Sequence, residues 1–171
     1  MRSVAVRWML VLALCVGGHA PRPAAAGPGA VERTAADFER SALDGTPIRM
    51  ADWRGKVVLI NFWATWCAPC LIEMPRFSDW QRQYAGQGLQ VLGISMDDSV
   101  EPVKRLLNQR GVSYPVIMGD TKLARLFGGV TGLPSSFVID RTGRIVARYR
   151  GEVDLVQLES LLKTQLAAQK P

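Results

Sequence analysis

Apolar residues recur along the chain with the spacings of both strands and helices. Two continuous runs rich in branched side chains, residues 56–63 and 89–96, are typical of strands buried at the centre of a sheet. Residues 67–84 and 100–111 carry apolar side chains three and four positions apart, which predicts helices. Residues 97–99, Asp-Asp-Ser, are expected to cap the second of these helices.

The remaining pattern predicts two hairpins and two further helices. Leu-Asp-Gly-Thr at residues 43–46 is a turn between short extended pieces, and residues 136–140 and 144–149 flank a second turn, Arg-Thr-Gly. A short helix is expected at 121–127 and a last one, capped by Asp154, up to Leu166. This order of elements predicts an α/β fold with a mixed central sheet and helices on both faces.

The first 26 residues have the pattern of an export signal. Arg2 and Arg7 precede an apolar run at 8–18, which is shorter than the roughly 20 residues that span a bilayer, and small residues follow up to Ala26. Two other interpretations stay open, namely lipidation at Cys15 and an uncleaved membrane anchor. All three place the domain outside the cytoplasm, in the periplasm.

The chain divides into a signal peptide (1–26), a linker rich in Ala, Pro and Gly (27–36) and one domain (37–168). The formal net charge is +6, and removing residues 1–26, with three arginines and no acid, leaves +3. That is an ordinary surface charge, so no nucleic-acid partner is expected.

The cysteine and histidine content limits the possible chemistry. Beyond the signal only Cys67 and Cys70 remain, because Cys15 and the single histidine, His19, lie within it. Two cysteines without histidine cannot build a Cys/His zinc site or the triad of a serine or cysteine hydrolase. We therefore expect neither a metal nor a cofactor.

The chemistry lies in one motif, Trp66-Cys67-Ala68-Pro69-Cys70, between a buried strand and a helix. At a helix start, unpaired N–H groups and the positive end of the dipole stabilise a thiolate, which predicts Cys67 as the attacking sulfur and Cys70 as the resolving thiol. Two alternatives stay open. One is a static disulfide, which stabilises the fold little when it closes a loop of only four residues. The other is a Cu(I) site of two thiolates.

The chain resembles the TlpA/ResA/DsbE branch of the thioredoxin superfamily. The resemblance rests on the motif with the Asn-Phe-Trp-Ala-Thr before it, on Glu-Met-Pro at 73–75, and on Gly-Leu-Pro-Ser-Ser-Phe-Val-Ile-Asp at 132–140. It implies a thioredoxin fold with an N-terminal β-hairpin and an inserted helical segment at 100–111. It also implies an exported thiol–disulfide oxidoreductase.

The resemblance assigns roles to further positions. Pro134 matches a cis-proline whose loop, with Leu133, faces the two cysteines and binds the substrate chain through its backbone. Glu73 matches an acid near the active site that tunes the thiols, although a solvated acid in the first turns of a helix is the plainer interpretation. Trp63 is expected in the core, and Trp66 is expected to present an apolar surface to partners.

Two positions depart from ordinary thioredoxins. Asn61 replaces a buried aspartate that helps to deprotonate the resolving cysteine, and Gly93-Ile94-Ser95 stands where a lysine is expected. The resemblance favours a reductant of protein disulfides, acting in cytochrome c maturation (on apocytochrome c) or copper-site assembly and re-reduced by a membrane thiol carrier. An oxidant that introduces disulfides, or a Cu(I)-binding chaperone module, is the alternative.

Overall fold

A computed structural model describes residues 33–168 of the 171-residue chain. A six-stranded sheet in the order β1-β8-β7-β4-β5-β6 forms its centre, and β2 and β3 form a separate hairpin. The strands are β1 (Arg33–Thr34), β2 (Glu39–Ser41), β3 (Pro47–Arg49), β4 (Val57–Trp63), β5 (Leu89–Ser95), β6 (Val116–Met118), β7 (Ser135–Ile139) and β8 (Arg144–Arg150). The α-helices are α1 (Ala68–Tyr84), α2 (Val100–Arg110), α3 (Thr121–Leu126) and α4 (Leu155–Ala167), with short 3-10 turns at Met50–Trp53 and Ala85–Gln87.

The middle of the sheet is buried on both sides. Every residue of β4 is buried, and this strand pairs in parallel with β5 and antiparallel with β7. An unbroken run of branched and aromatic side chains suits this position because neither face meets water. The mixed sheet predicted from the order of elements is confirmed.

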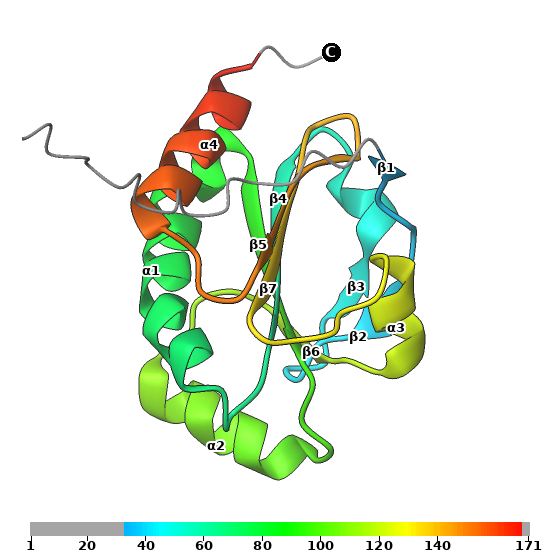
Figure 1. Cartoon of the computed structure of the whole chain (residues 1–171), viewed down its shortest axis with the longest axis vertical. Helices are drawn as coiled ribbons and strands as arrows, with labels where there is room; N and C mark the ends of the chain where they lie inside the picture. The colour runs from blue at the N-terminus through cyan, green and yellow to red at the C-terminus, as the bar shows by residue number, and fades with distance from the viewer. Residues whose placement is uncertain (1–32, 169–171) are drawn as a thin grey trace, which may run out of the picture.

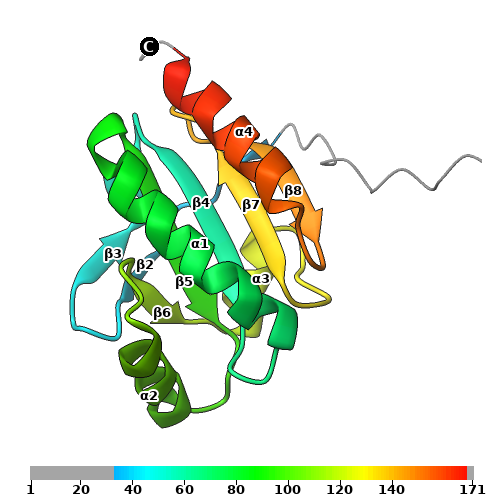
Figure 2. The same ribbon diagram turned by 90° about the vertical axis from the view of Figure 1, so that its left-hand side faces the viewer.

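Helices α1 and α4 cover one face of the sheet, as Figure 1 shows with the sheet nearly edge-on and Figure 2 shows from the helical side. Phe77 and Trp80 of α1 and Leu158 and Leu162 of α4 are fully buried in one cluster with this face. Each side chain of that size contributes roughly 1.5–3 kcal/mol when it leaves water.

The opposite face is covered by α3 and the β2–β3 hairpin (Figure 1). Phe127 lies edge-on to Phe62 at 5.5 Å between ring centroids and packs against Phe137 at 5.2 Å. The hairpin is fixed to the sheet edge by a bridge between Ala42 and Ile117 of β6.

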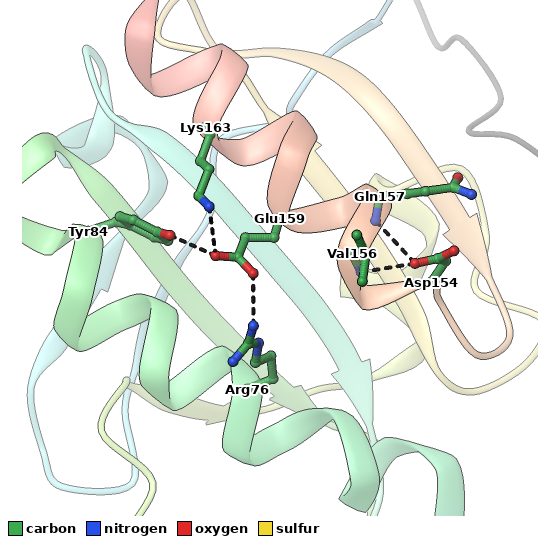
Figure 3. Close-up of polar contacts among 7 residues, drawn as sticks. All are labelled: Arg76, Tyr84, Asp154, Val156, Gln157, Glu159 and Lys163. Atoms are coloured by element: carbon green, nitrogen blue, oxygen red, sulfur yellow. Dashed lines mark hydrogen bonds and ion pairs between the residues drawn. The ribbon is translucent and has the colours of Figure 1, made fainter.

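Helix α4 is capped as predicted and is joined to α1 by one carboxylate. The Asp154 side chain accepts hydrogen bonds from the backbone N–H groups of Val156 and Gln157 (Figure 3). Glu159 accepts from Arg76, at 3.0 Å, and from the Tyr84 hydroxyl, at 2.7 Å; both donors belong to α1. Lys163 lies 3.1 Å from the same carboxylate.

Two details differ from the sequence expectations. Strand β1 lies inside the expected linker, where Arg33 pairs with Ile145 and Ala35 is buried, because the outer edge of β8 accepts another strand. Ser99 is the N-cap of α2 but makes no side-chain cap hydrogen bond. The expected signal peptide lies outside the described residues, and among residues 33–168 no helix is long and apolar enough to cross a membrane.

Candidate active site

The two cysteines lie where β4, α1 and the loop into β7 meet. Strand β4 ends at Trp63, and α1 begins at Ala68, directly after Cys67. Because Phe62 pairs with Ser135 across the antiparallel β4–β7 ladder, the loop that enters β7 lies beside the end of β4. The topology therefore brings together two motifs that are more than 60 residues apart in the sequence.

Cys67 and Cys70 form a disulfide with 5.3 Å between their Cα atoms. Cys67 is the N-cap residue of α1, its carbonyl accepts from Leu71 N–H, and its own side chain makes no cap hydrogen bond. Pro69 lies in the first turn, where a helix needs no N–H donor. Cys70 is 1% exposed and Cys67 5%, so Cys67 is the more accessible of the two sulfur-bearing residues.

An acidic side chain outside the motif fixes the loop before Cys67. Asp97, at the end of β5, accepts from Thr65 N–H at 3.0 Å, from the Thr65 hydroxyl, and from Ser95 Oγ at 2.8 Å. The sequence predicts Asp97 as part of the cap of α2, whereas in the structure its carboxylate holds Thr65. Its position at the end of a strand next to β4 was the available signal, because such ends converge at one edge of the sheet.

The Leu133–Pro134 peptide bond is cis, as the resemblance implied. Pro134 is buried, its carbonyl accepts from Gly151 N–H at 2.9 Å, and Leu133 packs against the cluster that contains both cysteines. The expected substrate loop therefore packs against the same hydrophobic cluster as the two cysteines.

The two tryptophans around the motif occupy opposite environments. Trp63 is fully buried in the core, as expected, whereas Trp66 is 71% exposed. Ile72, on the second turn of α1, is 66% exposed. The exposed indole of Trp66 is available to contact a partner.

Glu73 is buried, contrary to the plainer expectation of a solvated acid. It is 1% exposed, its Oε1 accepts from Val153 N–H at 2.9 Å, and its Oε2 has no hydrogen-bond partner among the described residues. Burial raises the pKa of the Glu73 carboxyl to about 7, against the opposing effect of the Val153 hydrogen bond, and the charge of Glu152 raises it further. Three residues after Cys70, Glu73 lies on the same side of α1.

The two departures from ordinary thioredoxins have structural explanations. Asn61 is buried, and its Nδ2 donates to Ser136 Oγ at 3.0 Å across the β4–β7 pair. A side chain on Gly93 would meet Trp63 Nε1 and the Tyr114 ring at 3.1 Å each. A lysine at 93 would therefore displace the tryptophan that packs below the motif.

Two hollows on the described part of the chain lie away from the cysteines. They have volumes of about 390 and 560 Å³, lie against the β2–β3 hairpin and the loop before β6, and share Asp44, Val112, Tyr114 and Pro115. Among residues 33–168 no group of three His, Cys, Asp or Glu side chains is placed to hold a metal ion.

Comparisons with known proteins agree with this geometry. Residues 31–148 match the AhpC/TSA family model. The chain is 36% identical over 135 residues to the thiol-disulfide oxidoreductase ResA of Bacillus thuringiensis, covering 78% of this chain and 77% of that protein, and equally similar to ResA of Bacillus anthracis.

Solved structures give the same result. A thiol:disulfide interchange protein of the thioredoxin family from Chlorobium tepidum superposes with a TM-score of 0.74 at 34% identity, covering 84% of this chain and all of that one. A secreted thiol-disulfide isomerase from Corynebacterium glutamicum gives 0.71 at 28% identity, covering 77% and 84%. The thioredoxin fold is thereby confirmed, and the chain belongs to the AhpC/TSA family of the thioredoxin superfamily, as a thiol–disulfide oxidoreductase of the ResA type.

Proposed function

We propose that the protein is an exported reductant of disulfides in substrate proteins. The observation that carries the proposal is a Cys67–Cys70 pair at the start of α1 with a buried acid, Glu73, one turn further along the same helix. A static bridge needs no titratable group beside it, whereas thiol exchange needs a proton donor and acceptor.

The first step uses the reduced form of the pair. The Cys67 thiolate, stabilised by the N-terminus of α1, attacks one sulfur of a substrate disulfide. A bond forms between Cys67 and that sulfur, the substrate S–S bond breaks, and the other substrate sulfur leaves as a thiolate that takes up a proton.

The second step releases the substrate. Cys70 loses its proton and attacks the Cys67 sulfur, so the Cys67–Cys70 bond forms and the second substrate sulfur leaves as a thiol; two electrons have passed to the substrate. Asn61 cannot accept a proton, so we assign proton transfer with Cys70 to Glu73. A carboxyl whose pKa is about 7 is suited to both directions near neutral pH.

Trp66, Leu133 and Pro134 are the proposed substrate contacts. The exposed indole of Trp66 supplies apolar area, and the loop at Leu133–Pro134 enters β7 beside the end of β4. A flat apolar surface with a backbone edge suits an extended chain on either side of a cysteine.

The proposed compartment is the periplasm, with or without an anchor in the inner membrane. Support comes from the pattern of residues 1–26 and from the secreted relative of Corynebacterium glutamicum. The proposed partners are apocytochrome c or copper-site assembly proteins as substrates, and a membrane thiol carrier as the electron donor, since an oxidising compartment does not keep the pair reduced.

The direction of electron flow is tested by the reduction potential of the pair, measured by equilibration with a thiol buffer. We expect about −250 mV or below, close to thioredoxin, because Ala68-Pro69 places no cation between the cysteines. A value near about −120 mV would identify an oxidant. If the thiol buffer never reduces the Cys67–Cys70 disulfide, the bridge is a static structural one and the proposal is wrong.

The exchange mechanism is tested separately by trapping. Cys70→Ser should accumulate a mixed disulfide between Cys67 and substrate proteins, because the resolving thiol is missing. Cys67→Ser is the matched control and should trap far less, since Cys70 is the more buried sulfur. Equal trapping by both variants would contradict the assigned roles.

A further inference from the structure

Three arginines gather beside the loop that carries the cis-proline, on the side away from α1. Arg150 is the last residue of β8 and pairs with Ser135, directly after Pro134. The hydrogen bond from Gly151 N–H to the Pro134 carbonyl joins the two segments next to it. The exposed Arg150 is therefore one strand spacing from the proposed substrate loop.

Arg148 continues this row along β8 and is held in one orientation. Its Nη2 donates to the Gly129 carbonyl, and its guanidinium lies 5.1 Å from the centre of the Phe137 ring. Arg150 lies two positions further along β8 and therefore on the same face of the sheet as Arg148, and burial lowers the pKa of Arg148.

Arg33 of β1 completes the group. A methyl group on Gly128 would lie 3.5 Å from Nη1 of Arg148 and 3.7 Å from Nη1 of Arg33, so the two guanidinium groups converge over the same turn. Gly128 has a φ of 80°, a left-handed conformation that glycine adopts without strain, and it lets the turn pass beneath these side chains.

These three cations have no acidic partner within 4 Å among residues 33–168. Arg144, on the same strand, pairs with Asp140 at 3.2 Å. Like charges that lie together without neutralisation destabilise the folded chain, and an anionic partner that binds them removes this cost.

We propose that Arg33, Arg148 and Arg150 are a docking surface for an acidic segment of the substrate protein, next to the cysteine that Cys67 attacks. The inference rests on the proposed function, because it assigns a charge pattern to the substrate of the same site. Arg148 and Arg150 follow one another along β8, so the geometry suits an extended segment. A lipid bilayer lying on Arg150 would cover the loop at Pro134, which the substrate must reach.

The test compares two disulfide peptides that differ only in carrying Asp or Ser beside the disulfide. The full chain is reduced and mixed with each peptide, and the rate of peptide reduction is followed by chromatography at low and high salt. The variant is Arg33→Gln with Arg150→Gln; Arg148 is left in place because it holds the Gly129 turn. The control, Arg82→Gln with Arg105→Gln, removes the same charge from exposed positions on α1 and α2.

At low salt the variant should lose about three- to tenfold in rate with the Asp peptide and keep its rate with the Ser peptide, and the loss should shrink in about 0.5 M salt. The control should reduce both peptides like the unmodified chain. Equal rates with both peptides in all proteins would overturn this inference and leave the proposed function standing. No reduction of either peptide by the unmodified chain would overturn the proposed function itself.

A second measurement separates a lipid partner from a peptide partner. Binding to vesicles of phosphatidylglycerol is measured by co-sedimentation for the unmodified chain and both double variants. If only the Arg33/Arg150 variant loses vesicle binding while the two peptides are reduced at equal rates, the surface binds anionic lipid and the peptide proposal is wrong.

Discussion

Glu73 makes the stability of the folded protein depend on pH between about 4.5 and 7. Burial raises the pKa of this carboxyl from an ordinary 4.5 to about 7, so between these values the folded chain binds a proton that the unfolded chain has lost. Stability is therefore highest below pH 4.5 as far as Glu73 is concerned, and it falls as the pH rises toward 7. The two pKa values correspond to a loss of about 2.5 kcal/mol between pH 5 and pH 8.

Residues 33–168 contain no histidine and, in the oxidised protein, no free thiol that would titrate between pH 5 and 8. The only histidine of the chain, His19, precedes the described domain, and the oxidised pair of Cys67 and Cys70 carries no thiol to titrate. The free energy of unfolding of the oxidised protein should be measured by denaturant titration at several values between pH 5 and 8. Glu73→Gln, which keeps an oxygen for Val153 N–H, should remove most of the slope whatever its effect on absolute stability.

The control is Glu152→Gln, which neutralises the exposed acid that raises the Glu73 pKa only as a lesser cause. It should retain most of the slope. The reasoning is refuted if the Glu73→Gln protein still loses stability like the unmodified protein across this range, because the protonated group would then lie elsewhere.

Three further substitutions test the fold around the site by the free energy of unfolding. Glu159→Gln should lower the free energy of unfolding by about 1–2 kcal/mol at pH 7, a figure reduced to allow for the solvent around its partners. Because hydrogen bonding holds the pKa of Glu159 at about 2, this loss should vanish as the pH falls from 4.5 toward 2. A loss that stays constant over this range would contradict the prediction. Gly93→Ala should cost about 1–3 kcal/mol because the added methyl group presses on Trp63. An unchanged midpoint of denaturant unfolding would show that Trp63 moves aside without cost. Asp97→Asn should cost about 1–3 kcal/mol by weakening the bonds to Thr65, and an Asp98→Asn control should be near neutral.

The elements that define the fold were predictable because their hydrophobic patterns are local. The run at 56–63 became the fully buried β4, and the spacing over 67–84 became α1, whose apolar face covers the sheet. The cis bond at Pro134 was predictable only through the resemblance, since the local sequence is equally typical of an ordinary turn.

What the sequence did not reveal depends on contacts between distant segments. Strand β1 has two residues and no apolar alternation, and only the open edge of β8 makes it a strand. Asp97 is typical of a helix cap, yet the carboxylate faces Thr65 because β4 and β5 end side by side. Neither arrangement can be inferred from the residues on either side of the segment.

Glu73 combines both kinds of information. Its spacing from Cys70 follows from the sequence, but the choice between a solvated acid and a buried one depends on the loop at Val153, 80 residues later, which covers the carboxyl and gives it a single N–H donor. One donor is too few to keep a buried carboxylate charged at an ordinary pKa, so the acid titrates near neutrality. An asparagine at 61 leaves the site without a second buried acid on β4, and Glu73 is therefore the group on which the proton transfer proposed for Cys70 depends.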